Sequence, residues 1–94
     1  MIRLNVFFEA KDADSATRLL ELASELVEKS RNDDGCVAYD VFQSATRTGV
    51  MMICETWADQ HALDAHSASV HFTNIVPMME ALTCHGLKLE RFEF

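Results

Sequence analysis

Apolar and polar residues follow two different periods along the first third of the chain. Residues 2–9 carry apolar side chains at every second position, which is typical of a strand. From Ala16 the apolar positions recur at helical spacing as far as Ser30. The polar turn Asn32-Asp33-Asp34-Gly35 then ends the helix, with a glycine where a left-handed turn costs little. We therefore expect a strand over Ile2–Glu9 and a long helix after it.

The middle of the chain predicts a hairpin. Residues Cys36–Gln43 and Val50–Trp57 are both rich in apolar and β-branched side chains. The segment Ser44–Gly49 between them is polar and ends in glycine, as a turn should. These two segments are expected to pair as antiparallel strands.

Helical periodicity returns after the hairpin. Asp59 is expected to cap a short helix that runs to about His66, and the small polar segment 67–69 interrupts it. A longer helix follows and is expected to end at His85-Gly86, before a last strand over Leu87–Phe94. Its apolar stripe consists of Phe72, Ile75, Val76, Met79 and Leu82.

One proline lies inside this predicted helix. Pro77 has no N–H to donate, so we expect a kink near Thr73 to Val76.

The order of elements is β-α-β-β-α-β, with an additional short helix before the second main one. This order is the split βαβ pattern of the ferredoxin-like α+β fold, an antiparallel sheet with helices on one face. A chain of 94 residues is expected to form a single domain over 1–94.

The strands are apolar on both sides, which a sheet covered on one face does not require. The segment Val50-Met51-Met52-Ile53-Cys54 is apolar throughout, and Phe7 lies opposite Val6 and Phe8. Two amphipathic helical stretches can cover only one face. Leaving a few hundred Å² of apolar surface in water on the other face costs several kcal/mol at ~25 cal/mol per Å². A homodimer that packs sheet to sheet is the simplest cover.

Charge and cysteine content narrow the classes of partner. The net charge is −7, which disfavours nucleic acid, and no basic cluster suggests a membrane surface. No apolar run reaches the ~20 residues of a membrane helix, and the first residues do not resemble a signal peptide. Three cysteines without pairwise spacing fit a reduced, cytoplasmic protein better than disulfides or a zinc motif.

The most informative stretch joins the third strand to the short helix. It reads Glu-Thr-Trp-Ala-Asp-Gln-His-Ala-Leu-Asp-Ala-His over residues 55–66. Glu55 and Trp57 share one side of the strand, and His66 shares a helix face with Ala62 and Leu63. That face must point inward, so His66 is expected to be half buried near Trp57, where helix and sheet meet.

Together with Gly35-Cys36-Val37-Ala38-Tyr39, this stretch resembles the antibiotic biosynthesis monooxygenase family, and the resemblance extends over essentially the whole chain. It implies a dimeric α/β-barrel with a ligand pocket between sheet and helices. It also implies oxidation of quinols or polyketide phenols by molecular oxygen, without metal or flavin. Other members degrade haem, isomerise a phosphorylated sugar derivative or have no known role.

Oxygenation of a phenol without a cofactor needs a base for the phenolic proton and a dry pocket for the intermediates. We expect His66 to be the base or proton shuttle. Asn5 and Trp57 are expected to be orienting hydrogen-bond donors. The residues expected to bind the substrate are Tyr39, His71, Phe72 and Glu55.

Neither a metal nor a cofactor is expected. His61, His66 and His71 are spaced by five residues, which spreads them around a helix axis and makes a poor metal site. With only three glycines, the chain has no glycine-rich phosphate loop for a nucleotide cofactor.

Other interpretations stay open. The haem-degrading branch shares an asparagine at Asn5, but has a tryptophan in place of His66 and a histidine in place of Val76, so haem degradation is disfavoured. An isomerase would need a polar pocket with a cationic side chain that binds the substrate, for which the candidates are Arg3, Arg18, Arg47 and Arg91. A non-catalytic binding module would fill its pocket with its own side chains.

Each candidate residue also has a purely structural interpretation. His66 could pack the seam between helix and sheet, and Trp57 could anchor the core through a bonded indole N–H. Glu55 could pair with Arg3 or Arg91 across the sheet.

Overall fold

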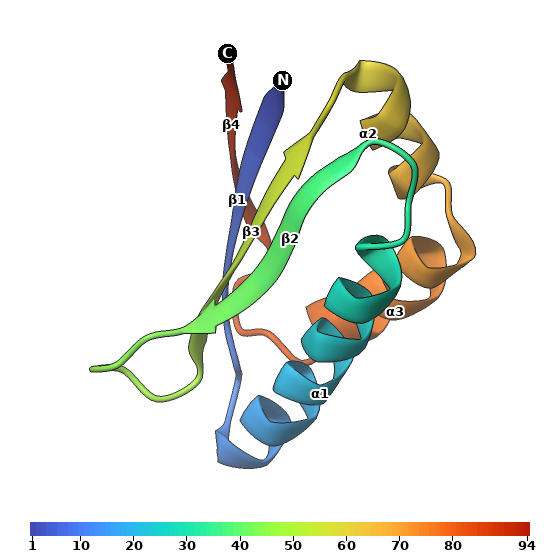
Figure 1. Ribbon diagram of the computed structural model, residues 1–94. Helices are drawn as coiled ribbons and strands as arrows, with labels where there is room; N and C mark the ends of the chain where they lie inside the picture. Colours follow the sequence, from blue (N-terminus) through green and yellow to red (C-terminus); the bar gives the residue numbers. More distant parts are fainter.

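Four antiparallel strands form one sheet in the order β2-β3-β1-β4, and three helices cover one of its faces (Figure 1). The computed structural model describes all residues from Met1 to Phe94. The elements are β1 Ile2–Glu9, α1 Ala13–Ser30, β2 Cys36–Gln43, β3 Val50–Trp57, α2 Gln60–Ser67, α3 Val70–Ala81 and β4 Lys88–Glu93. The predicted ferredoxin-like α+β fold, with its additional short helix, is thereby confirmed. None of the helices is long and apolar enough to cross a membrane.

Each helix begins at a side chain that satisfies a free backbone N–H. Asp12 accepts from the N–H of Ser15 at 2.7 Å, and Asp59 accepts from that of Ala62 at 2.8 Å. Ser69 does the same for Phe72 at the start of α3. These caps lie where the small polar residues of the sequence predict them, and Ser69 turns the chain between α2 and α3.

The end of α3 differs from the sequence prediction. The helix ends at Ala81 instead of His85-Gly86, and Pro77 lies inside it. Cys84 turns away because its backbone N–H bonds the carbonyl of Glu9 at the end of β1. The Thr83 hydroxyl caps the carbonyl of Glu80 and accepts from the N–H of Gly86, so local polar bonds replace the last helical turn.

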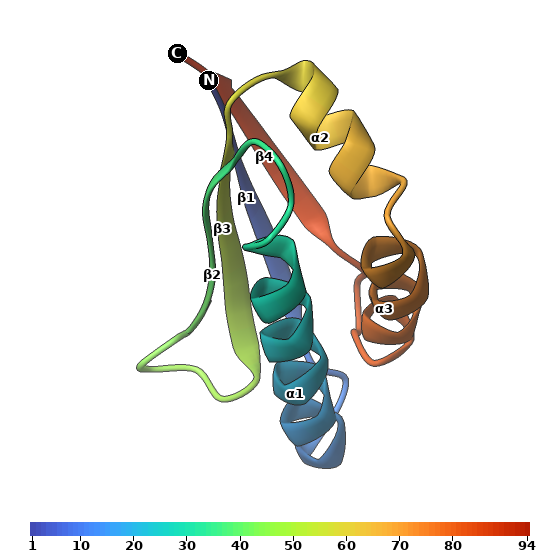
Figure 2. The ribbon, with the colours of Figure 1, turned by 45° about the vertical axis from the view of Figure 1, so that its right-hand side comes forward.

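The core lies between the sheet and the helices (Figure 2). On β3, Met51, Ile53, Glu55 and Trp57 are all buried, and on β1 every even-numbered position from Ile2 to Phe8 is buried. The long helix contributes a buried stripe of Leu19, Leu22, Ala23, Leu26 and Val27. Strand alternation and helical periodicity therefore meet in one layer of apolar side chains, as the pattern predicts.

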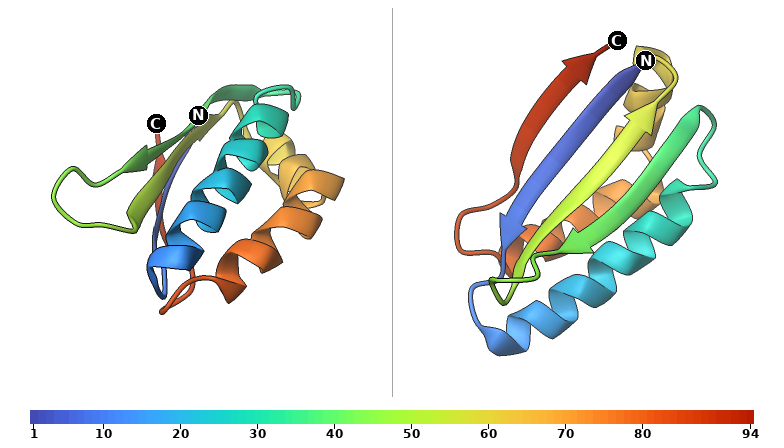
Figure 3. Two further views of the ribbon diagram at one scale, coloured as in Figure 1. Left: turned by 90° about the horizontal axis from the view of Figure 1, so that it is seen from below. Right: turned by 60° about the vertical axis from the view of Figure 1, so that its left-hand side comes forward.

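The opposite face of the sheet carries no helix (Figure 3). The register places Phe42, Met52 and Phe7 in one row across β2, β3 and β1 on this face. Phe7 is 39% exposed and Phe42 50%. Phe92 of β4 lies on the same face and is also exposed. We call this surface the open face; its exposed aromatic side chains lie among polar ones such as Arg3, Asn5 and Glu90.

The turn after α1 is built around a glycine in the left-handed region. Gly35 has φ +79°, and its carbonyl accepts from the N–H of Ala58 at 2.8 Å, which ties the turn to the start of α2. A Cβ placed on Gly35 would overlap the Cβ of Ala62. Both the backbone conformation and the close packing of α2 therefore require glycine here.

We predict that Gly35→Ala destabilises the protein by about 2–4 kcal/mol, because positive φ and overpacking act together. Gly86→Ala is the matched control: its φ is +75°, but nothing lies within 4 Å of the added Cβ. It should cost only about 1 kcal/mol from the backbone strain. Urea unfolding at one fixed protein concentration measures both. Equal losses in the two variants would show that Gly35 is not tightly packed against α2.

Candidate active site

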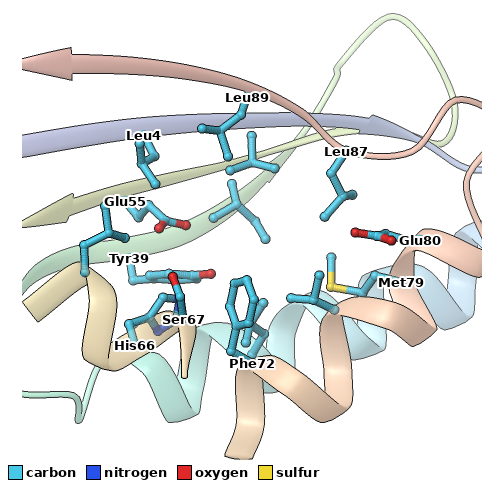
Figure 4. Close-up of a pocket in the computed structure, with 15 residues that line it drawn as sticks. Leu4, Tyr39, Glu55, His66, Ser67, Phe72, Met79, Glu80, Leu87 and Leu89 are labelled. Carbon is cyan, nitrogen blue, oxygen red and sulfur yellow. The ribbon is translucent and has the colours of Figure 1, made fainter. Parts of the chain in front are cut away.

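A cavity of about 270 Å³ lies between the sheet and the helices α2 and α3. Figure 4 shows Leu4 and Glu55 reaching into it from the strands, and His66 and Phe72 from the helices. Its wall consists of Leu4, Val6, Leu26, Tyr39, Ile53, Glu55, Leu63, His66, Ser67, Phe72, Val76, Met79, Glu80, Leu87 and Leu89. Most of these side chains are apolar, so the few polar groups that reach the cavity define its chemistry.

His66 is the most deeply buried of the polar groups, with a side chain only 1% exposed. Its ring lies 4.5 Å from the Trp57 ring between centroids, 5.4 Å from Tyr39 and 5.2 Å from Phe72. The inward helix face that it shares with Ala62 and Leu63 places it there, and it is more buried than the sequence suggests. The aromatic surroundings leave the imidazole little freedom to rotate.

The two nitrogens of His66 have different surroundings. Nδ1 lies 2.8 Å from Oδ2 of Asp33, whereas Nε2 is buried without any hydrogen-bond partner in the protein. A carboxylate accepts from an N–H, so Asp33 favours the tautomer with the proton on Nδ1. The lone pair of Nε2 is then free to accept a proton or a hydrogen bond, and His66 is one of the residues that line the cavity.

Burial decides the charge of this imidazole. Removal from water lowers the pKa of His66 below its ordinary value, and the carboxylate of Asp33 opposes that effect only in part. His66 is therefore neutral near pH 7 and available as a base. When the ring takes a proton, the negative charge of Asp33 balances the positive charge of the imidazolium.

Glu55 and Trp57 form a second polar unit. Both side chains lie on the inward side of β3, and the indole N–H of Trp57 donates to Oε1 of Glu55 at 2.9 Å. Burial raises the pKa of Glu55, although the bonds from Trp57 and Tyr39 partly counter this. Burial and the nearby Glu55 raise the pKa of Tyr39 in turn, so its hydroxyl keeps its proton. The neutral phenol and the carboxyl group are paired across β2 and β3.

The structure brings only some of the predicted residues together. His66, Glu55, Tyr39 and Phe72 all line the cavity. Trp57 does not line the cavity. It is 0% exposed, and its indole N–H donates to Glu55. Its position matches the structural interpretation, a core anchor with a bonded N–H.

Asn5 and His71 lie outside the cavity. Asn5 belongs to the odd-numbered side of β1, which faces away from the helices, and it accepts from the thiol of Cys54 at 3.3 Å. The expectation that Asn5 and His66 meet in one pocket is corrected by this register, because the two residues lie on opposite sides of the sheet. His71, at the start of α3, lies behind His66 with its ring centroid 5.8 Å away.

The main residue that the sequence analysis missed is Asp33. Its Oδ2 lies 2.8 Å from Nδ1 of His66 and 2.9 Å from Nε2 of His71. The sequence shows Asp33 only as part of a polar turn, 33 residues before His66. The signal that could have found it is topological, since the turn before β2 and the end of β3 lie at the same end of the sheet. Ser67, Glu80, Leu87 and Leu89 also line the cavity without having been predicted.

Asp33, His66 and His71 offer three potential metal-ligand atoms within 4.8 Å of one another. Both ring nitrogens approach the same carboxylate oxygen at distances of 2.8 and 2.9 Å, which are those of charge-assisted hydrogen bonds. Hydrogen bonding accounts for the cluster as it stands, and we assign no metal centre to it.

The fold and the cavity define a class of protein: a ferredoxin-like domain that encloses a small apolar pocket with a neutral imidazole and a buried carboxyl. The model of the family "Antibiotic biosynthesis monooxygenase" matches residues 1–78. The chain belongs to this family, as its sequence suggested.

Solved structures agree over the whole chain. A conserved protein of unknown function from Bacteroides thetaiotaomicron, described as a possible oxidoreductase, is 43% identical with a TM-score of 0.93, covering 99% of this chain and 96% of that one. A structure described as an antibiotic biosynthesis monooxygenase is 32% identical with a TM-score of 0.92, covering 100% and 98%. Among curated proteins, "Putative monooxygenase YcnE" of Bacillus subtilis is 28% identical over 99% of this chain and 97% of its own length.

We predict that Glu55→Gln gains stability relative to the wild type as the pH rises from 5 to 8. The pKa of Glu55 is raised in the folded state, so folding holds its proton and wild-type stability falls as pH passes from the unfolded to the folded pKa. The slope for one proton is at most about 1.4 kcal/mol per pH unit. Glutamine keeps an acceptor for Trp57 but does not titrate.

Urea unfolding at several pH values measures this difference. Glu28→Gln, an exposed position on α1, is the control and should show no such trend. A constant difference between Glu55→Gln and the wild type across this range would contradict a raised Glu55 pKa.

Proposed function

We propose that this protein is a cofactor-independent monooxygenase that oxidises a small aromatic or quinol-type molecule with molecular oxygen. The observation that carries the proposal is the buried, unpartnered Nε2 of His66 in the wall of an apolar cavity. Membership of the monooxygenase family and relatives named as monooxygenases support the same class of reaction.

The first step proposed is proton abstraction. Nε2 of His66 takes the phenolic proton, and the carboxylate of Asp33 stabilises the imidazolium that forms. The phenolate transfers an electron to oxygen far more readily than the phenol does. For a phenol, one oxygen atom enters the ring as a second carbonyl, and the other leaves as water with the phenolic hydrogen and the displaced ring hydrogen. For a quinol, one oxygen atom enters as a ring hydroxyl, and the other leaves as water with the two phenolic hydrogens. The substrate supplies all the electrons, so no flavin or metal is required.

The remaining walls serve binding and water exclusion. Phe72 and the apolar residues of the cavity contact the flat faces of the ring, and the cavity volume of about 270 Å³ suits a compact molecule. The Tyr39 hydroxyl, which keeps its proton, and the Glu55 carboxyl group offer hydrogen bonds to the polar groups of a substrate. The mostly apolar wall limits the contact of radical or peroxide intermediates with water.

The cavity gives little support to the alternatives. Arg3, Arg18, Arg47 and Arg91, the candidate anchors of an isomerase for a phosphorylated substrate, do not line it. Asn5, the one feature shared with the haem-degrading branch, lies on the other side of the sheet. A non-catalytic module would have no reason to leave an imidazole nitrogen unpaired beside a cavity.

The assembly that we propose is a cytoplasmic homodimer formed through the open face. Phe7, Phe42 and Phe92 would bury their exposed surface against the second sheet, which removes the cost of leaving them in water. The three cysteines are all unpaired, consistent with a reducing compartment.

We predict that His66→Asn lowers kcat for a quinol substrate by a factor of about 100 or more, the usual contribution of a general base. Asparagine places a donor N–H where Nδ1 of His66 bonds Asp33, but it has no base at the Nε2 position. Oxygen consumption with a panel of one- and two-ring quinols measures the effect in protein treated with a chelator.

His61→Asn is the control on the same helix, because His61 is exposed and far from the cavity wall. It should keep wild-type activity. Unchanged oxygen uptake in a folded His66→Asn protein would exclude His66 as the base, and absence of uptake in the wild type with every quinol would count against the reaction itself.

We predict that Phe7→Glu converts the dimer into monomers. Phe7 lies on β1, an inner strand of the open face, and a buried unpaired carboxylate costs several kcal/mol, which weakens association by a factor of about 100 or more. Light scattering at micromolar concentration measures the mass. Val70→Glu is the control, because Val70 is 75% exposed on α3 and belongs to the helical side. A monomeric wild type would refute the proposed dimer.

A further inference from the structure

Two imidazoles share one carboxylate oxygen. Nδ1 of His66 and Nε2 of His71 lie 2.8 and 2.9 Å from Oδ2 of Asp33, and both can donate an N–H to it at the same time. Each ring then has one further nitrogen that can gain or lose a proton without breaking its bond to Asp33. For His66 this is Nε2, and for His71 it is Nδ1.

These two free nitrogens face different surroundings. Nε2 of His66 is buried, and His66 is one of the residues that line the cavity. The His71 side chain is 16% exposed and lines a surface depression on the other side of α3, together with Glu25 and Lys29. His71 Nδ1 bonds no protein group and is not among the buried unpartnered atoms, so it reaches water.

The cluster has one negative charge to balance one positive charge. A second positive ring 5.8 Å from the first would repel it, so protonation of one histidine disfavours protonation of the other. Burial makes a positive charge more costly on His66, whose side chain is 1% exposed, than on His71, whose side chain is 16% exposed. The other titratable groups around the cluster are Tyr39 and Glu55 on the cavity side, and Cys36 near Asp33.

We propose that Asp33 couples the two rings, so that the proton His66 takes from a molecule in the cavity is matched by a proton that His71 releases to water. Nε2 of His66 gains a proton and Nδ1 of His71 loses one, while both N–H bonds to Asp33 persist. The net charge of the cluster stays at zero throughout. The inference rests on the proposed function for the source of the proton, but the coupling itself is a property of the free protein.

The coupling makes Asp33 and His71 positioning residues, since neither lines the cavity. Asp33 sets which nitrogen of His66 is free, and His71 connects the buried imidazole of His66 to solvent on the side away from the cavity.

The test follows the charge and tautomer of each ring by ¹⁵N NMR of histidine-labelled protein across the pH range. In the wild type we expect His66 to hold its proton on Nδ1 and the two rings to titrate with mutual repulsion. In His71→Gln the amide keeps a donor to Asp33 but cannot ionise, so His66 should take up its proton about one pH unit higher. In Asp33→Asn it should do so at least about one unit lower, with mixed tautomers.

His61→Gln, an exposed histidine on α2, is the control and should leave the titration of His66 unchanged. If His66 titrates identically in the wild type and in His71→Gln, the coupling is refuted. The His71→Gln test does not depend on whether Asp33→Asn folds. His71 is partly exposed, and its replacement tests the coupling alone.

Oxygen uptake separates this inference from the proposed function. With an active quinol, the acid limb of the kcat/KM profile should move up by the same interval in His71→Gln, while KM at high pH stays constant. Coupled NMR titrations without oxygen uptake would refute the proposed function and leave the coupling intact. Oxygen uptake with a pH profile unaffected by His71→Gln would refute the coupling and leave the function.

Discussion

The hydrogen bond between His66 and Asp33 is the constraint on which the site depends. A buried imidazole must satisfy at least one nitrogen, and the carboxylate at 2.8 Å does so while leaving the other nitrogen free. The bond joins α2 to the turn after α1, and that turn needs Gly35 to approach the helix. Backbone geometry far from the cavity thus decides which atom of His66 is available inside it.

Burial shifts the pKa values of His66 and Glu55, two of the ionisable groups of the cavity, in opposite directions. It lowers the pKa of His66 and raises that of Glu55, so both groups shift toward their neutral forms. Pairs of groups whose environments move their pKa values apart are typical of sites that transfer protons. The mostly apolar wall, whose carboxyl groups belong to Glu55 and Glu80, also favours an uncharged aromatic ligand over a phosphorylated or carboxylated one.

The sequence predicted what depends on local pattern and failed where segments distant in sequence meet. Alternation and capping residues gave the strands and the starts of the helices, and the shared helix face gave the burial of His66. Asp33 could not be found, because its partners are 33 and 38 residues away. Asn5 was misplaced although its side of the strand was read correctly, because strand alternation alone does not tell which face the helices cover. The end of α3 was missed because contacts with Glu9 determine it.

The edge strand β4 relates the solvent access of the cavity to the proposed dimer. β4 pairs only with β1, and every one of its side chains is exposed. Leu89 is 60% exposed and yet lines the cavity, so the cavity meets solvent along this strand. Oxygen chemistry needs water kept out, and the helices do not cover this edge. A second copy that packs on the open face beside β4 would therefore do more than hide Phe7 and Phe42: it would limit access of water to the imidazole.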